Sequence, residues 1–327
     1  MVRYPLGMLT LLALLACTGP SDTGADSADT GGPQAPVTVR VMTWNVEGLG
    51  RVGSEEHDAA VAVVRRLSPD VLLLNELDEG DADGLAALAD ALDYPFTLDY
   101  DDNPFGSLHN GVVARGTVIE DRVWTSAALS SDDAANDLTR LPVHVVLSVG
   151  GRTVAAAGNH WKSGYESADR FRRAVDGHRM AQLAERVAAD VRIVCGDVNE
   201  DLADDDAGEV YERVPSGMPS GFALGEDLQA RVDGDGLPYS PFVTMADAGL
   251  DMVDALQLDG RSDTRASSGR RIDYCFAAGD AAIVAEVYDS RDDAADEGLP
   301  KPGPIPDDPY ATEHASDHLP VFVDLTL

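Results

Sequence analysis

The stretch SDHLPVFVDL (residues 316–325) places a carboxylate and an imidazole, Asp317 and His318, directly before an apolar run. Within that run Val321 and Val323 alternate with their neighbours in the period-two pattern of a β-strand. A buried strand gains nothing from an adjacent acid and histidine, because ionisable groups lose hydration when they are buried. The pair therefore points to a function that is located at the end of a strand.

Five other apolar, strand-like runs of the sequence carry polar residues at their ends in the same way. Together the six runs carry Asn45, Glu76, His160, Asp197, Asn199, Asp273, Asp317 and His318. One such residue is usually a hydrogen-bonded polar group of the core. Eight of them at the ends of six strands favour a common cleft, since the ends of strands converge on one rim of a sheet.

The rest of the pattern predicts the fold class. Helical spacing of apolar residues is found over 57–70 and 81–95, and the longest helical stretch covers 166–190. The strand-like runs outnumber these helices and show no strict strand–helix alternation, while residues 200–260 are acidic and rich in loops. We expect an α/β domain in which two packed mixed or antiparallel sheets are flanked by helices.

The overall charge limits the classes of partner. The chain has 327 residues, of which 44% are hydrophobic, and its 58 acidic and 24 basic residues give a net charge of −34. A field of this sign repels nucleic acid and anionic membranes at long range, and no overall basic footprint is present. A local basic groove or a metal-bridged contact is still compatible with it, as is a simple adaptation to a salty medium.

The N-terminal segment has the features of a secretory leader. Within residues 1–16, the apolar run from Leu6 to Ala16 is too short to span a bilayer and fits a signal peptide. It runs into LLAC (14–17), which resembles a bacterial lipoprotein processing box. The resemblance implies cleavage before Cys17 and lipidation of its thiol; the alternative is an ordinary signal peptide. Residues 17–36 then read as a flexible tether.

Cys195 and Cys275 lie in apolar runs, so we expect two inert buried thiols rather than a disulfide.

The chemistry of the eight polar residues is consistent with metal-assisted hydrolysis. Carboxylate and amide oxygens are hard ligands that suit Mg²⁺, Mn²⁺ or Ca²⁺, and no Cys/His spacing indicates zinc. Histidines beside carboxylates suit general acid–base work. The sequence contains no serine nucleophile elbow and no P-loop. Attack of water on a phosphate ester, assisted by a metal ion, fits this set of residues best.

The motifs that carry these residues resemble, in order, those of the endonuclease/exonuclease/phosphatase superfamily, which includes DNase I. The resemblance covers residues 37–327, the expected catalytic domain, and implies a DNase I-like four-layer α/β sandwich. Any one motif is weak, whereas six in the right order are specific. They read TWNVEG (43–48), LNELDE (74–79), GNHWKSG (158–164), CGDVNED (195–201), RRIDYCF (270–276) and SDHLPVF (316–322).

The resemblance also implies a metal site. Glu76 matches the principal metal-binding glutamate of the superfamily, and Asn45 matches the asparagine beside it. Asp317 matches a carboxylate that is often a further ligand. We expect Mg²⁺ or Mn²⁺ at this site.

The remaining matches imply the catalytic roles. His160 matches the histidine that contacts the scissile phosphate, and Asp197 and Asn199 match the pair that handles the attacking water. Asp273 matches the aspartate that orients the last histidine, His318. Family mechanisms differ on whether His318 or Asp197 activates water; we favour an Asp273–His318 acid–base dyad, with Asp197 and Asn199 positioning the water.

Several features favour the secreted bacterial nuclease branch and DNA as the substrate. Val198 and Trp161 depart from common family residues, the valine without an expected effect. The branch stays open because the sequence does not show the extra Glu or Tyr that supports the phosphate-contacting histidine in some branches. The motif NHWKSG, the stretch YSPFVT (239–244) and an arginine-rich helix resemble that branch. The helix offers a positive patch for DNA or, equally, only a solvated face. Its arginines are Arg170, Arg172, Arg173 and Arg179.

Other functions are compatible with the same residues. A phospholipid phosphodiesterase or an inositol or sugar phosphate phosphatase would use the same chemistry, and a non-catalytic surface lipoprotein that binds cations or a partner is the alternative from another class. The acidic loops 201–209 and 233–236 are candidates for structural Ca²⁺, although plain solvated loops are favoured.

No obligate protein partner is evident. The predicted location is extracytoplasmic, anchored in a bacterial membrane through Cys17, on the periplasmic face or the cell surface.

Overall fold

The computed structural model describes residues 35–78, 82–100, 103–293 and 297–327. The predicted leader and nearly all of the predicted tether lie outside the described residues, so their assignment stays a prediction. No helix of the described part combines the length and the apolar character needed to cross a membrane.

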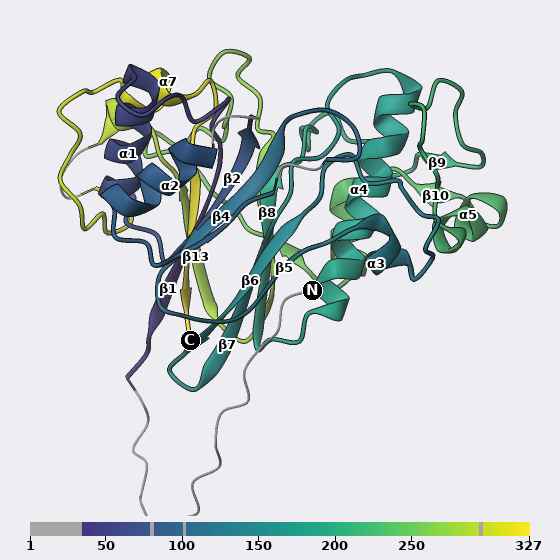
Figure 1. Ribbon diagram of the computed structural model, residues 1–327, viewed down its shortest axis with the longest axis horizontal. Coiled ribbons are helices and arrows are strands. Elements are labelled where there is room, and N and C mark those ends of the chain that lie inside the picture. The colour runs from purple at the N-terminus through teal and green to yellow at the C-terminus, as the bar shows by residue number, and fades with distance from the viewer. Residues whose placement is uncertain (1–34, 79–81, 101–102, 294–296) are drawn as a thin grey trace, which may run out of the picture. The chain divides into compact units, whose positions relative to one another are not determined.

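Two six-stranded sheets form the centre of the domain (Figure 1). In the first sheet the order is β13-β14-β1-β2-β4-β3, and in the second it is β11-β12-β8-β7-β6-β5. Each sheet has one parallel pair, β1 with β2 and β7 with β8, and its other neighbours are antiparallel. The strands of the first sheet are β1 (Thr38–Asn45), β2 (Val71–Leu77), β3 (Phe96–Leu98), β4 (His109–Ala114), β13 (Ala282–Val287) and β14 (Val321–Thr326). Those of the second are β5 (Thr117–Val123), β6 (Val143–Val149), β7 (Arg152–Gly158), β8 (Val191–Asp197), β11 (Asp251–Met252) and β12 (Asp273–Gly279).

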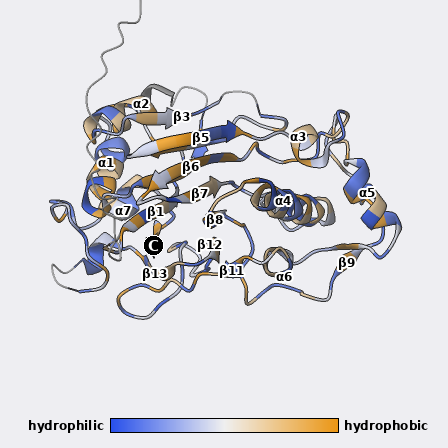
Figure 2. Ribbon diagram, turned by 90° about the horizontal axis from the view of Figure 1, so that it is seen from below, coloured by the Kyte–Doolittle hydropathy of each residue, from blue (hydrophilic) through white to orange (hydrophobic). Residues whose placement is uncertain are grey.

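Helices cover the outer faces of both sheets. Figures 1 and 2 show α1, α2 and α7 on one side of the strands and α3, α4 and α6 on the other. The helices are α1 (Glu55–Leu67), α2 (Ala82–Ala91), α3 (Ser126–Ser130), α4 (Ser167–Arg186), α5 (Glu226–Asp233), α6 (Pro241–Asp247) and α7 (Ala311–Ala315), with a 3₁₀ turn at Ser290–Asp292. A small ribbon of β9 (Val210–Tyr211) and β10 (Leu237–Pro238) lies beside α5. This arrangement confirms the predicted two-sheet α/β fold.

The apolar residues divide into the layers that such a fold requires. One cluster fills the space between the sheets, with Val41 and Leu73 from the first sheet and Ile193 from the second. Two further clusters lie beneath the outer helices, one under α1, α2 and α7 and one under α4 and α6. The strands read as continuous apolar runs because both of their faces are buried.

Local sequence signals explain where α1 begins and ends. The Ser54 hydroxyl accepts a hydrogen bond from the amide of His57, which caps the first turn, and acidic residues follow in that turn. The helix ends at Ser68, which adopts a left-handed conformation with φ of 47°, and Pro69 prevents its continuation. The longest predicted helix is likewise the longest observed, α4. The short helices α5 and α6 lie in the region that we expected to be mainly loop.

The expectation of two free thiols is wrong, because Cys195 and Cys275 form a disulfide. Strands β8 and β12 pair antiparallel with these two residues directly opposite each other, and their Cα atoms are 4.1 Å apart. Directly opposed residues on antiparallel strands bring their Cβ atoms together, so a bond can form across the pair. The sequence shows two cysteines in two strands but not the register that places them face to face.

Candidate active site

The ends of six strands from both sheets meet at one place. Strand β1 ends at Asn45, β8 ends at Asp197, and β12 begins at Asp273, while His160 follows β7 and His318 precedes β14. The side-chain nitrogen Nδ2 of Asn45 donates to Asp197 Oδ2 at 3.1 Å, and this hydrogen bond joins the first sheet to the second. The structure therefore brings together the polar strand ends that the sequence predicted to share a cleft.

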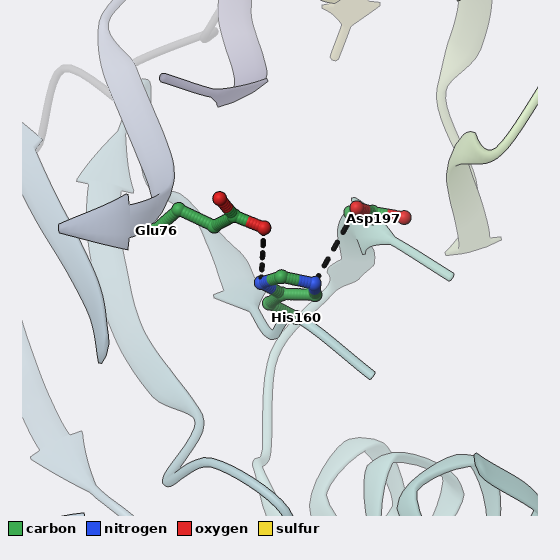
Figure 3. A group of neighbouring side chains, drawn as sticks. All are labelled: Glu76, His160 and Asp197. Atoms are coloured by element: carbon green, nitrogen blue, oxygen red, sulfur yellow. Dashed lines mark ion pairs between the residues drawn. The ribbon is translucent and has the colours of Figure 1, made fainter. Parts of the chain in front are cut away.

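Glu76 enters this cluster through an irregularity in its strand. The pairing of β2 with β4 shifts register between Asn75 and Leu77, and Glu76 between them has a φ of 61°. Asn199 and Glu47, which adjoin the cluster, also adopt left-handed conformations, with φ of 55° and 48°. Non-glycine residues in this region carry strain that concentrates at functional sites. In Figure 3, Glu76, His160 and Asp197 face one another.

The first cluster has the composition of a metal site. One potential ligand atom from each of Glu76, His160 and Asp197 lies within 4.8 Å of the others. Glu76 Oε1 is 3.6 Å from His160 Nδ1, too far for a hydrogen bond, and Nδ1 is buried with no hydrogen-bond partner. Burial, with Arg140 and His318 nearby, holds the pKa of His160 well below its usual value, so its ring is neutral. A carboxylate and a neutral imidazole with unused lone pairs fit a divalent cation.

The second cluster is an acid–base pair that shares Asp197 with the first. His318 Nδ1 is 2.8 Å from Asp273 Oδ2, and the ligand atoms of Asp197, Asp273 and His318 also lie within 4.8 Å of one another. Although burial lowers the pKa of His318, the charge and hydrogen bond of Asp273 raise it to about 10. Burial and the charge of Asp273 raise the pKa of Asp197 to about 7. Because Asp273 holds Nδ1, the other nitrogen, Nε2, is directed toward Asp197, at 3.9 Å.

The other predicted residues lie around these two clusters. The amide of Asn199 donates to Asp197 Oδ1 at 2.8 Å, so the two residues act as one turn. The Asn45 oxygen accepts from the amide of Glu47 at 3.1 Å and keeps one lone pair for a ligand. Asp317 is held by Arg265 at 2.6 Å and belongs to neither metal-type cluster of the described residues.

A glycine allows the loops to approach this closely. Gly196 has a φ of +150°, and a Cβ atom built on it would lie 1.8 Å from the carbonyl oxygen of Asn159. Any side chain at Gly196 would push away the segment that carries His160. The glycine of the GDVN motif is therefore explained by the approach of β8 to the end of β7.

A buried network of three asparagines, which was not predicted from the sequence, lies beneath the site. Asn75 donates to Asn110 at 2.8 Å, Asn110 donates to Asn159 at 3.0 Å, and the Asn75 oxygen accepts from the amide of Asp197 at 3.0 Å. All three asparagines are fully buried. Asn75 and Asn159 directly precede Glu76 and His160, and this adjacency was the signal available in the sequence.

The arginine-rich helix forms neither an exposed positive patch nor a solvated face. Of the four arginines predicted to form the patch, Arg172, Arg173 and Arg179 are buried and Arg170 is partly exposed. Arg173 donates to the carbonyl oxygens of Lys162 and Gly164 at 2.8 and 3.0 Å, so it holds the loop that follows His160. Arg173 and Arg179 are internal because acidic residues from distant segments, Glu200 and Asp137, pair with them, whereas Arg172 packs over the ring of Phe105.

The acidic loops 201–209 and 233–236 contribute to neither metal-type cluster of the described residues. In the first loop Asp201 and Asp206 accept hydrogen bonds from amides of their own turns, and Asp205 accepts from Ser240. These carboxylates thus have partners within the protein.

Known structures share this architecture at low sequence identity. An endonuclease/exonuclease/phosphatase protein from Beutenbergia cavernae aligns with a TM-score of 0.56 and 21% identity over 89% of this chain and 72% of its own. TDP2 from D. rerio, solved with a single-strand DNA product, aligns with a TM-score of 0.54 and 15% identity over 89% and 99% of the two chains. A family protein from Leptotrichia buccalis aligns with a TM-score of 0.54 and 13% identity over 88% and 100%. No curated protein matches the sequence.

The fold and the two clusters define a phosphoesterase of the DNase I-like class. The sequence profile of the Endonuclease/Exonuclease/phosphatase family matches residues 42–318, which include all eight predicted site residues. The chain belongs to this family, and it is a metal-dependent phosphoric ester hydrolase.

Proposed function

We propose that the protein is an extracytoplasmic endonuclease that hydrolyses phosphodiester bonds of DNA. The observation that carries the proposal is the position of Asp197, which joins the metal-type cluster of Glu76 and His160 to the Asp273–His318 pair. One compact site thus contains ligands for a cation and a group that can transfer a proton, as hydrolysis of a phosphodiester requires.

Glu76 and Asp197 would hold Mg²⁺ or Mn²⁺, with the free lone pair of the Asn45 oxygen as a further ligand. Carboxylate and amide oxygens are the ligands that these ions prefer, which makes Mg²⁺ or Mn²⁺ the proposed cofactor. When bound, the metal would neutralise charge that develops on the phosphate and the leaving oxygen. The role of Asp317 as a further ligand stays a prediction. In the structure its carboxylate is paired with Arg265.

The protein residues would divide the remaining work. Asp273 fixes the orientation of His318, so Nε2 is the atom that exchanges a proton with water or with the leaving group. Asp197 and Asn199, joined in one turn, would position the attacking water. His160 would contact the phosphate from the neutral ring that burial imposes.

Hydrolysis assays test this function directly. The purified protein is incubated with plasmid DNA, RNA, sphingomyelin and inositol phosphates, each with Mg²⁺, Mn²⁺ or Ca²⁺ and with EDTA. We expect nicking of the plasmid that depends on Mg²⁺ or Mn²⁺ and stops with EDTA. Intact DNA beside a cleaved lipid or inositol phosphate would keep the mechanism and refute the DNA substrate; no metal-dependent turnover at all would refute the site.

The extracytoplasmic location rests on the leader and on the disulfide. A disulfide between Cys195 and Cys275 is typical of proteins that fold in an oxidising compartment. We propose that Cys17 anchors the protein in a bacterial membrane through a lipid. Replacing Cys17 with serine should move the protein from the membrane fraction to the soluble fraction, and an unchanged distribution would refute the anchor.

A further inference from the structure

Three loops that leave the active site are joined at their exposed ends by one side-chain cluster. Tyr165 lies in the loop after His160, and Arg270 lies three residues before Asp273. Arg270 Nη1 donates to the Tyr165 hydroxyl at 2.7 Å, and Arg270 Nη2 donates to Asp204 Oδ2 at 3.1 Å. Asp204 lies in the loop after Asp197, so the cluster connects the loops of all three site residues.

Tyr165 is unusual because its ring is fixed in place and yet open to solvent. Its residue exposure is 76%, the largest among the exposed large hydrophobic residues of the described part of the chain. The hydroxyl bond to Arg270 holds the ring, and the guanidinium lies 5.8 Å from the ring centre. An exposed aromatic ring that is already ordered loses little entropy when a planar group stacks on it.

Arg270 lies in a short backbone hairpin that also contains Arg265, a second arginine near the catalytic residues. Arg265 forms backbone bridges to Arg270 on one side and to His318 on the other. Two strand spacings therefore separate the backbones of Arg270 and His318, a span of about 10 Å, which one nucleotide can bridge. The Arg265 side chain is 42% exposed, and Nε and Nη2 donate to Asp317 at 2.8 and 2.6 Å.

Both guanidinium groups retain unused donors. Nη1 of Arg265 has no partner in the described ranges, and Nε of Arg270 is buried without one. Nε itself is closed to solvent, but the Arg270 side chain is 23% exposed, and each Nη atom carries a second hydrogen beyond the one that Tyr165 or Asp204 accepts. A phosphate oxygen is an acceptor that such guanidinium donors bind well. Each arginine is already paired with a carboxylate, Asp317 or Asp204, so the pair offers guanidinium donors to an anion rather than a net positive charge.

We propose that Tyr165 stacks an unpaired base of the substrate strand beside the bond being cleaved, and that Arg265 and Arg270 bind the phosphate of that neighbouring nucleotide. This inference rests on the proposed nuclease function and narrows it to substrates with an unpaired base next to the cleaved bond. Stacking on an aromatic side chain does not depend on which base is present, so the subsite selects for strand structure rather than for sequence.

The stacking contact is tested with a dinucleotide, which contains a single phosphodiester bond, and with analogues that lack one of its two bases. Tyr165→Ala should raise the KM for the dinucleotide about tenfold, from the usual strength of base stacking, and change kcat less. Removing the stacked base should raise the KM of the wild type similarly but add little in Tyr165→Ala, because the contact is already lost. Tyr310→Ala, which removes another exposed tyrosine, is the matched control.

A merely structural role for Tyr165 would give a different result. In that case the effects of Tyr165→Ala and of base removal would be independent and would multiply, which would overturn the stacking contact. An unchanged KM in Tyr165→Ala would overturn it as well. Tyr165→Phe keeps the ring and loses the hydroxyl bond, so it should retain most of the base dependence.

The phosphate contact is tested through salt dependence on a single-stranded oligonucleotide. Arg270→Ala should reduce the slope of log KM against log salt by about 0.7, the contribution of one phosphate contact on a single strand. Arg213→Ala removes an equal charge from an exposed position and should leave the slope unchanged. Equal slopes in the two variants would overturn the phosphate contact.

These outcomes separate the inference from the proposed function. If the wild type cleaves DNA and neither Tyr165→Ala nor Arg270→Ala behaves as described, only the subsite is wrong. If the wild type cleaves sphingomyelin or an inositol phosphate and leaves every nucleic acid intact, the nuclease function and the subsite are both wrong.

Discussion

Arg179 offers a direct test of the finding that α4 is an internal helix. Its side chain is fully buried and donates from Nε to Asp137 Oδ1 at 3.0 Å and from Nη1 to Asp227 Oδ2 at 2.7 Å. Asp137 is also fully buried, and its carboxylate accepts a further hydrogen bond from the backbone amide of Gly225. Arg179→Leu would remove the cation and leave the carboxylate of Asp137 buried without its partner.

The structure gives the size of the expected effect. Removing one partner of a buried ion pair costs roughly 3–5 kcal/mol in the free energy of unfolding, because the remaining charge is uncompensated. Arg170, on the same helix, is about one-third exposed and pairs with Glu209, so Arg170→Leu should cost about 0–1 kcal/mol. A pair of substitutions on one helix thus separates a buried from a partly exposed arginine.

Urea unfolding of the oxidised protein measures both variants. Arg179→Leu should lower the midpoint without a large change in the m-value, and its thermal midpoint should fall by about 10 °C. The double variant Arg179→Leu with Asp137→Leu should recover part of the loss, since a buried ion pair can often be replaced by apolar residues. A stable Arg179→Leu variant that only loses affinity for DNA would refute the reasoning and restore the helix as a DNA-binding face.

Three further predictions address the site, the acid sensitivity and the cross-link. Glu76→Ala and His318→Ala should each abolish turnover with an unchanged circular dichroism spectrum; activity within a few-fold of wild type in both would contradict the site assignment. Burial and the neighbouring Arg231 lower the pKa of His178 from 6.5 to about 4. The neutral ring therefore stabilises the fold fully above pH 6.5, and this stabilisation is lost as the pH falls through 4. Wild type should therefore lose about 3 kcal/mol more than His178→Gln over this range, measured by urea unfolding, and equal losses would exclude the effect. Replacing Cys195 and Cys275 with alanine should lower the free energy of unfolding by about 2–4 kcal/mol, measured in the same way, and an unchanged value would show that the cross-link adds no stability.

Much of the active site could be predicted from the sequence because its residues are tied to local signals. Each predicted residue lies in a short motif at the end of an apolar run, as Asp197 does at the end of β8 and His318 does before β14. Strand periodicity and strand ends are local properties, and the order of the six motifs gave the fold class. The structure then placed the other predicted residues around Asp197, except Asp317, which pairs with Arg265.

Contacts between distant segments could not be predicted in this way. The arginines of α4 predicted either a positive patch for DNA or a solvated face, yet Arg179 is buried because Asp137 and Asp227 come to it from other parts of the chain. The cysteines lie 80 residues apart, and only the register of β8 with β12 makes them partners. Arg265 could not be predicted as a site residue, because its contact with Asp317 forms only where its hairpin pairs with the segment around His318.

The sequence by itself determined the class of fold and predicted the chemistry and the principal residues of the site, because these depend on periodicity and on residue types at strand ends. Only the tertiary structure decided which charges are buried, which cysteines pair, and that Tyr165 and Arg270 meet at the edge of the site. The physical reason is that burial and pairing depend on which segments come together in space, and a single sequence records each segment only with its neighbours along the chain.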